Sequence, residues 1–162
     1  MNNEVTKMKL ADTLDFVKLA HKDQMYGDLP YWKHTAAVLT WGISEFRDAF
    51  TEDMKHAAFL HDVLEDTSYT ETDLLEMGYS STIVDMVKLL TKDKNLSYFE
   101  NIQKIIDSGN LGAMMIKWSD NHSNLTGDKS HWEETRAAKS NAKYAKSKAM
   151  LMEAISQKLK FN

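Results

Sequence analysis

The sequence has no cysteine, a single proline and six glycines among its 162 residues. Without cysteine, the chain can form no disulfide, no thiolate metal site and no cysteine nucleophile. Because proline and glycine interrupt helices, their scarcity favours long periodic helices over many short strands. Hydrophobic residues make up 43% and charged residues 27% of the chain, as in ordinary globular proteins. We therefore expect an all-α fold in a single compact domain over residues 1–162.

Long apolar runs and a strong charge of one sign are also missing. The N-terminal sequence MNNEVTKMKLADTLDF lacks the apolar core of a signal peptide, and no stretch approaches the length of a membrane span. The formal net charge is −4, so the composition does not indicate a basic surface for nucleic acid. We expect a cytoplasmic protein that binds neither nucleic acid nor membranes.

Apolar periodicity and capping residues predict a series of helices. The first begins at Leu10 and runs towards Tyr26, a turn follows at residues 27–30, and a second helix covers residues 31–46. Thr51, followed by two acids, is typical of the N-cap of the next helix. Further helices are expected over residues 70–78, 80–90, 98–108 and 111–125, and a long last helix over about residues 130–159. No internal repeat or linker divides the chain.

The most informative stretch is residues 56–67, His-Ala-Ala-Phe-Leu-His-Asp-Val-Leu-Glu-Asp-Thr. It places His61, Asp62, Glu65 and Asp66 within the most apolar helical segment of the chain. In one continuous helix, positions 61 and 65 share a face, as do positions 62 and 66. Burial of such groups is costly unless something compensates. A divalent cation would compensate by binding His and Asp, whereas the alternative is an amphipathic helix with an acidic end.

Two other segments carry side chains that could complete a metal site. His34 opens a helix in Pro-Tyr-Trp-Lys-His-Thr (30–35), and Asp120 shares a helix face with Asn124 in Ile-Lys-Trp-Ser-Asp-Asn-His-Ser-Asn-Leu (116–125). A single buried His or Asp is more often a hydrogen-bonded core residue than a metal ligand, so neither segment alone indicates a metal site. Together with His61 and Asp62 they supply two imidazoles and two carboxylates, which suits Mn²⁺, Fe²⁺ or Zn²⁺.

The order of these segments resembles a known family. His34, His61-Asp62 and Asp120 match the H…HD…D pattern of the HD-domain phosphohydrolases. More narrowly, the chain resembles the hydrolase domain of bifunctional alarmone (ppGpp) synthetase/hydrolases and the small alarmone hydrolases. The matching motifs are AHKDQ (20–24), PYWKH (30–34), HDVLEDT (61–67) and IKWSDNHSNL (116–125). The resemblance predicts an HD-domain helical bundle with its motifs within residues 20–125, on which the C-terminal helix packs.

The resemblance also implies roles for the matching residues. It assigns four ligands of a divalent metal, most simply Mn²⁺, with Fe²⁺, Zn²⁺ or Co²⁺ as alternatives: His34, His61, Asp62 and Asp120. Glu65 and Asp66 would position and deprotonate the attacking water, and Asn124 would contact the sugar or phosphate of a nucleotide. The family's reaction removes the 3′-pyrophosphate of ppGpp, giving GDP and pyrophosphate. A divalent ion can activate water and neutralise a phosphate oxygen while a carboxylate accepts the proton.

The chain differs from the family pattern at positions that bind the substrate in the family. In the family pattern AHxGQxR the arginine, which belongs to the guanine-binding region, is Tyr26 here, and in KxADRxHNL the arginine is Asn121. Tyrosine can stack on a base but lacks the bidentate cationic donor of arginine. Lysines remain that could hold phosphates, and we expect Tyr26, Lys33 and Lys117 to contact the substrate. Further candidates are Lys22, Lys92, Lys94 and Arg136.

Three functions remain open from the sequence. The first is an alarmone 3′-pyrophosphohydrolase, and the second applies the same metal chemistry to another nucleotide, such as a nucleoside mono- or triphosphate. The third is a catalytically silent nucleotide- or protein-binding module. Because a degenerate domain would be expected to lose Glu65 or Asp66, their presence disfavours the third. The expected partner is a small nucleotide, the chain is expected to be a monomer or a homodimer, and His21 is expected to support the helix of His34.

Overall fold

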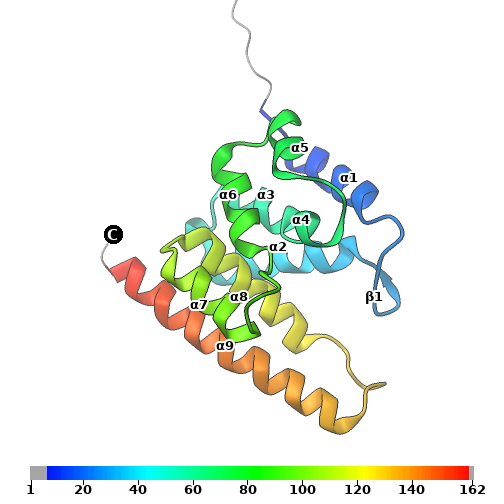
Figure 1. Cartoon of the computed structure of the whole chain (residues 1–162), viewed down its shortest axis with the longest axis vertical. Helices are drawn as coiled ribbons and strands as arrows, with labels where there is room; N and C mark the ends of the chain where they lie inside the picture. The colour runs from blue at the N-terminus through cyan, green and yellow to red at the C-terminus, as the bar shows by residue number, and fades with distance from the viewer. Residues whose placement is uncertain (1–6, 161–162) are drawn as a thin grey trace, which may run out of the picture.

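The computed structural model describes residues 7–160 and shows a bundle of helices with one small hairpin (Figure 1). The helices are α1 (Leu10–Ala20), α2 (Trp32–Phe46), α3 (Glu52–Leu60), α4 (Val63–Asp66), α5 (Glu71–Glu76), α6 (Ser81–Leu90), α7 (Tyr98–Asp107), α8 (Leu111–Thr126) and α9 (Glu134–Lys160), with a 3-10 turn, η1 (Arg47–Ala49), after α2. Strands β1 (Met25–Tyr26) and β2 (Leu29–Pro30) pair antiparallel, with Tyr26 opposite Leu29. The predicted all-α class is confirmed, with this hairpin as the one β element among the described residues.

Side-chain caps explain where most of the helices begin. In five of them the N-cap side chain accepts a hydrogen bond from the backbone N–H three residues further on: Thr51, Thr70, Ser80, Ser97 and Asn110. Such a bond satisfies one of the backbone donors that the first helical turn leaves without a partner. The predicted starts after Thr51, Thr70 and Ser80 are therefore confirmed.

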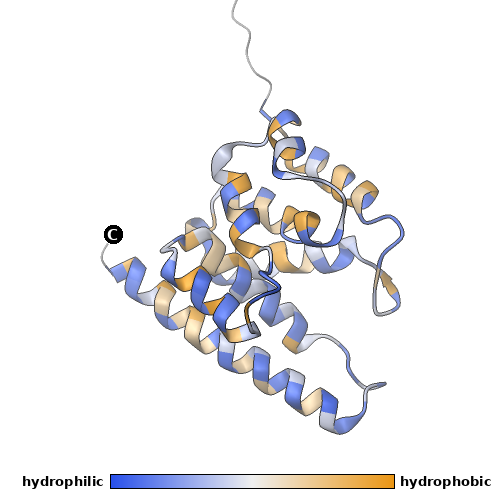
Figure 2. Cartoon of the chain, viewed as in Figure 1, coloured by the Kyte–Doolittle hydropathy of each residue, from blue (hydrophilic) through white to orange (hydrophobic). Residues whose placement is uncertain are grey.

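Helix α8 has more buried residues than any other described helix, and α2, α3, α6, α7 and α9 pack against it. Its residues 112–116 are buried, and at Gly112 an added Cβ would lie only 2.3 Å from Met86 Sδ of α6. Helix α9 packs along α8 and buries Ser147, Leu151 and Ile155. Figure 2 shows hydrophilic and hydrophobic bands alternating along α9, as expected for a helix with one covered face. No helix within residues 7–160 has the length and apolar character needed to cross a membrane.

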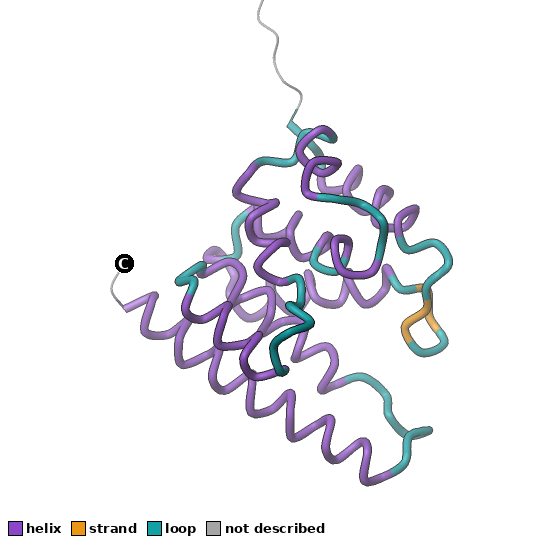
Figure 3. The backbone as a smooth tube through the Cα atoms, in the orientation of Figure 1, coloured by secondary structure: helices purple, strands orange, loops and turns teal. Residues whose placement is uncertain are grey.

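The predicted end of the first helix was wrong. Helix α1 ends at Ala20, and Tyr26 lies in the hairpin, which Figure 3 shows in orange at one edge of the bundle. Gly27 explains the tight turn, because its φ of 59° is a conformation that residues with a Cβ rarely adopt. The last helix also starts later than predicted, at Glu134.

The prediction of one continuous helix through residues 56–67 was also wrong. Helix α3 ends at Leu60 and α4 begins at Val63, while Asp62 takes a non-helical conformation with φ −105° and ψ 1°. His61 Nδ1 lies 2.7 Å from the carbonyl oxygen of Ala58, where it can donate to a carbonyl of the last turn of α3. The break separates His61 and Asp62 from the helix that carries Glu65 and Asp66.

Candidate metal centre and active site

Three buried side chains from three parts of the bundle converge at one point. His34 lies in the first turn of α2, His61 directly follows α3, and Asp120 lies in α8. Their candidate ligand atoms all lie within 4.8 Å of one another. Asp120 Oδ1 is 3.2 Å from His34 Nε2 and 3.8 Å from His61 Nε2. We call these three residues the inner cluster.

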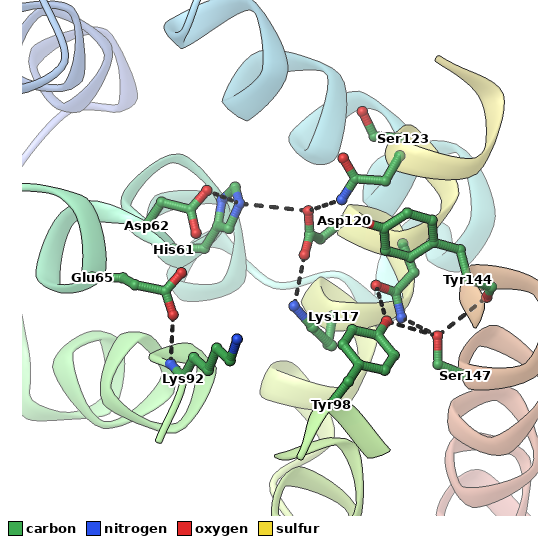
Figure 4. A network of polar contacts seen from close by, with 12 residues as sticks. His61, Asp62, Glu65, Lys92, Tyr98, Lys117, Asp120, Ser123, Tyr144 and Ser147 are labelled. Carbon is green, nitrogen blue, oxygen red and sulfur yellow. Dashed lines mark hydrogen bonds and ion pairs between the residues drawn. The ribbon is translucent and has the colours of Figure 1, made fainter. Parts of the chain in front are cut away.

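Three carboxylates form a second group beside it, which we call the outer cluster: Asp62, Glu65 and Asp66. Asp62 joins the two clusters, because its Oδ2 lies 2.9 Å from His61 Nε2. Glu65 Oε1 accepts a hydrogen bond of 2.8 Å from the backbone N–H of Lys92. Figure 4 shows Asp62 and Glu65 on one side of the site and Asp120 across from them. The break after α3 therefore places acidic groups next to the inner cluster.

The two imidazoles of the inner cluster are oriented through their Nδ1 atoms. His61 Nδ1 bonds to the Ala58 carbonyl, and His34 Nδ1 lies 3.2 Å from Ser123 Oγ, so both Nε2 atoms face Asp120. Metal-binding histidines are commonly oriented in this way. Among the described residues, His61 Nε2 is buried beside the Asp62 carboxylate at 2.9 Å but makes no hydrogen bond of regular geometry, and a cation bound between these groups could pair with both. The donor set fits a borderline divalent metal, and His34, His61 and Asp120 could hold one.

Charge neighbours determine the pKa values of the inner cluster. Burial would raise the pKa of Asp120, but the Lys117 ammonium at 2.8 Å and the two imidazoles hold it well below its ordinary range. Burial would lower the pKa of His61, but the carboxylates of Asp62 and Asp120 raise it to about 9. Burial would raise the pKa of Asp62, but the neighbouring His61 imidazole lowers it to about 2. In the metal-free protein at neutral pH, His61 is therefore an imidazolium between two carboxylates.

The pKa of Asp66, in the outer cluster, is shifted in the opposite direction from the pKa values of Asp62 and Asp120. Partial desolvation and the neighbouring carboxylates of Asp62 and Glu65 raise the pKa of Asp66 to about 6. A carboxylate with such a pKa is a better proton acceptor near neutral pH than an ordinary aspartate.

Comparisons with known proteins support the fold but not a specific activity. No protein-family model and no curated protein matches the sequence. A solved structure is similar to this chain, and the match covers 93% of each of the two chains. It is described as a metazoan ortholog of SpoT that hydrolyzes ppGpp and plays a role in starvation responses. The TM-score is 0.67 and the sequence identity is 24%. The two chains share a fold. The predicted all-α helical bundle is therefore confirmed.

In this fold, three of the four predicted substrate residues adjoin the inner cluster. The ring of Tyr26 stacks on His34, Asn124 Nδ2 donates to Asp120 Oδ1, and Lys117 pairs with Asp120. Lys33 Nζ instead lies 4.4 Å from the centre of the Trp32 ring.

Other residues at the site were not predicted from the sequence. The Tyr31 hydroxyl donates to Asp62, and Ser123 contacts His34. Buried His21 packs against Tyr31 with 4.8 Å between ring centroids, which agrees with its predicted support of α2. Helical spacing could have indicated both residues, because residues three apart on a helix are neighbours. Tyr31 precedes His34 by three residues, and Ser123 follows Asp120 by three.

Asn121, at the second substituted arginine position, belongs to a helix interface. Its side chain is fully buried; Nδ2 donates to Ser147 Oγ at 2.7 Å, and Oδ1 accepts from the Tyr98 hydroxyl at 3.0 Å. These bonds tie α8 to α7 and α9. Figure 4 labels the two partners, Tyr98 and Ser147, at its lower right. Adjacent residues of a helix point in different directions, so Asn121 lies behind Asp120 and does not face the inner cluster.

A small cavity of about 90 Å³ adjoins the outer cluster. Its polar lining includes Asp62, Glu65, Lys92, Tyr98 and Lys117. A larger hollow of about 660 Å³ near the end of α2 is lined by none of the residues of the two clusters. Size therefore does not identify the site here; the convergent ionisable groups do.

Proposed function

We propose that this protein is a metal-dependent nucleotide phosphohydrolase, and most specifically a ppGpp 3′-pyrophosphohydrolase that releases GDP and pyrophosphate. The observation that carries the proposal is the buried His34–His61–Asp120 cluster, which contacts the outer cluster through Asp62. The shared fold with a solved protein described as hydrolyzing ppGpp supports the choice of substrate class.

In this proposal the divalent ion is held by the inner cluster together with Asp62. The ion, most simply Mn²⁺, with Fe²⁺, Zn²⁺ or Co²⁺ as alternatives, would lower the pKa of a bound water and neutralise phosphate charge. His34 and His61 contribute Nε2 atoms that are already oriented. The depressed pKa values of Asp62 and Asp120 keep both carboxylates anionic, as ligands must be.

Glu65 and Asp66 position the attacking water and accept its proton. Glu65 is oriented by the backbone N–H of Lys92, and Asp66 has the raised pKa that suits a proton acceptor. Proton transfer to a carboxylate leaves a hydroxide to attack phosphorus. The P–O bond to the 3′ oxygen then breaks, and the proton held by the carboxylate passes to the 3′ oxygen. Pyrophosphate and a 3′ hydroxyl are the products.

Two lysines beside the small cavity hold phosphate oxygens in this proposal. Lys92 and Lys117 both line the cavity, together with the Tyr98 side chain. The cavity volume of about 90 Å³ is well below the roughly 300–1,000 Å³ of whole-ligand pockets. It therefore suits one phosphate group, while the rest of the nucleotide lies outside it.

A second candidate keeps the chemistry and changes the nucleotide. Tyr26 occupies the position at which the resemblance expects an arginine for guanine, and its hydroxyl already bonds to Asn124. This observation favours hydrolysis of another nucleoside phosphate if the guanine contact proves decisive.

The experiment that tests the proposal measures phosphate and pyrophosphate release from ppGpp and from nucleoside mono- and triphosphates, with Mn²⁺ and with chelator. We expect Mn²⁺-dependent pyrophosphate release from ppGpp. Release from ordinary nucleotides alone would support the second candidate. Binding of Mn²⁺ without turnover of any nucleotide would contradict both and favour a silent binding module.

A further inference from the structure

We propose that Tyr26 is a positioning residue of the metal centre and does not read the nucleotide base. Its ring holds His34, and its hydroxyl holds Asp120 through Asn124. This inference rests on the metal-binding function proposed above and deepens it, because it changes which residues determine nucleotide preference.

The first contact is between two rings. The Tyr26 and His34 rings are stacked, with 4.4 Å between centroids and 15° between planes. His34 Nδ1 bonds to Ser123 on its edge, and its Nε2 faces Asp120. The tyrosine ring covers one face of the imidazole and limits its tilt, while Ser123 limits its rotation.

The second contact is a chain of hydrogen bonds to the inner carboxylate. The Tyr26 hydroxyl donates to Asn124 Oδ1 at 2.8 Å, and Asn124 Nδ2 donates to Asp120 Oδ1 at 2.9 Å. Asp120 Oδ1 is also the oxygen of Asp120 that pairs with both imidazoles. Burial raises the pKa of Tyr26, so the phenol remains a proton donor at neutral pH. One side chain thus contacts one proposed ligand directly and reaches another through an amide.

The hairpin explains how Tyr26 reaches this position. Tyr26 ends β1, while Tyr31 follows β2 and donates its hydroxyl to Asp62 on the other side of the site. The end of α8 makes room for Tyr26 at Gly127, where an added Cβ would lie 3.3 Å from the Tyr26 hydroxyl oxygen. The hairpin therefore connects the α3–α4 junction with α8 across the inner cluster.

These contacts occupy the hydroxyl and one ring face of Tyr26 and both polar atoms of the Asn124 amide. The tyrosine ring has one face against His34, and its hydroxyl is bonded to the amide oxygen of Asn124. Removing a residue that hydrogen-bonds to a metal ligand and orients it typically weakens metal binding by roughly 10- to 100-fold. We therefore expect substitution of Tyr26 to weaken metal binding without changing base preference.

The test compares Tyr26→Phe, which removes only the hydroxyl, with Tyr26→Leu, which also removes the ring. Mn²⁺ affinity is measured by calorimetric titration of the metal-free proteins. We expect Tyr26→Phe to bind Mn²⁺ about 10-fold more weakly and Tyr26→Leu to bind it more weakly still. At saturating Mn²⁺, kcat should fall, while the ratio of KM values for guanine- and adenine-based 3′-pyrophosphorylated nucleotides should stay unchanged.

Tyr79→Phe is the matched control. The Tyr79 hydroxyl is likewise buried and donates to Thr13 Oγ1 at 3.0 Å, away from both clusters. This variant should lose stability but keep its Mn²⁺ affinity within about twofold, since the lost bond does not involve any side chain that contacts a proposed metal ligand.

Three results separate the possible failures. Equal Mn²⁺ affinity of wild type and Tyr26→Phe would overturn the positioning role alone. A several-fold shift towards guanine in Tyr26→Arg, with Mn²⁺ affinity unchanged, would assign the position to base reading and also overturn it. No Mn²⁺ binding by the wild-type protein would remove the proposed metal function and this inference together.

Discussion

The inner and outer clusters both contain carboxylates, but their surroundings move the carboxyl pKa values in opposite directions. Asp120 is 6% exposed, yet Lys117 and the imidazoles lower its pKa. Asp66 is exposed, yet desolvation and two neighbouring carboxylates raise its pKa to about 6. The local countercharge, more than burial, thus separates a carboxylate suited to bind a cation from one suited to accept a proton.

The largest expected effect comes from breaking the inner cluster. His61→Ala removes a buried Nε2 donor and leaves Asp62 and Asp120 without their imidazolium partner. We expect Mn²⁺ binding and nucleotide turnover to be abolished together, as measured by calorimetry and pyrophosphate release. His131→Ala, at an exposed histidine, is the control and should change neither. Undiminished Mn²⁺ affinity in His61→Ala would show that the metal binds elsewhere.

Substitution in the outer cluster should separate metal binding from turnover. Glu65→Gln keeps the size of the side chain and removes its charge, so the variant should bind Mn²⁺ while turnover falls by roughly 10²–10⁴-fold. Glu71→Gln, at an exposed glutamate paired with Lys88, should keep full activity. Full activity of Glu65→Gln would mean that the proposed role of Glu65 in water activation is wrong.

The pKa of His61 predicts how Mn²⁺ affinity depends on pH. With a pKa raised to about 9, His61 is protonated below that pH and must lose its proton to become a ligand. Mn²⁺ affinity should therefore rise about tenfold for each pH unit between roughly pH 6 and 8, as measured by calorimetry in buffers of different ionisation enthalpy. A flat profile would show that His61 binds no metal.

The same pKa has a consequence for stability in the absence of metal. Because the folded-state pKa lies above the ordinary value of 6.5, the contribution of His61 is fully present below about pH 6.5 and is lost as the pH rises through about 9. Added Mn²⁺ should reduce this loss, since it binds the neutral imidazole.

Sequence reasoning located the inner cluster because its signals are local. The spacing of His61 and Asp62 within an apolar segment, with His34 and Asp120 in two other apolar helices, already indicated a shared buried site. The capping residues Thr51 and Ser80 likewise set helix starts through bonds to the next turn. Such short-range chemistry can be read without a structure.

The remaining features depend on contacts between distant segments. The pairing of Tyr26 with Asn124 joins residues 98 positions apart, and that of Tyr31 with Asp62 joins residues 31 apart. The break after Leu60 was missed because residues 56–67 contain neither proline nor glycine. No local pattern distinguishes a tyrosine that contacts a base from one that contacts a histidine.

The smallest expected effect on the site comes from Asn121, although it is adjacent to Asp120. Asn121→Ala removes both bonds of the buried amide to Tyr98 and Ser147. The two hydroxyls still bond to each other, so each lost bond should cost about 0.5–1.5 kcal/mol. Urea denaturation should show a loss of stability of this order, while Mn²⁺ affinity should change less than about twofold because Asn121 is not among the outer partners of the ligands. A loss of Mn²⁺ affinity comparable to that of His61→Ala, without a loss of stability, would place Asn121 in the site and contradict the assignment of this residue to the α7–α8–α9 interface.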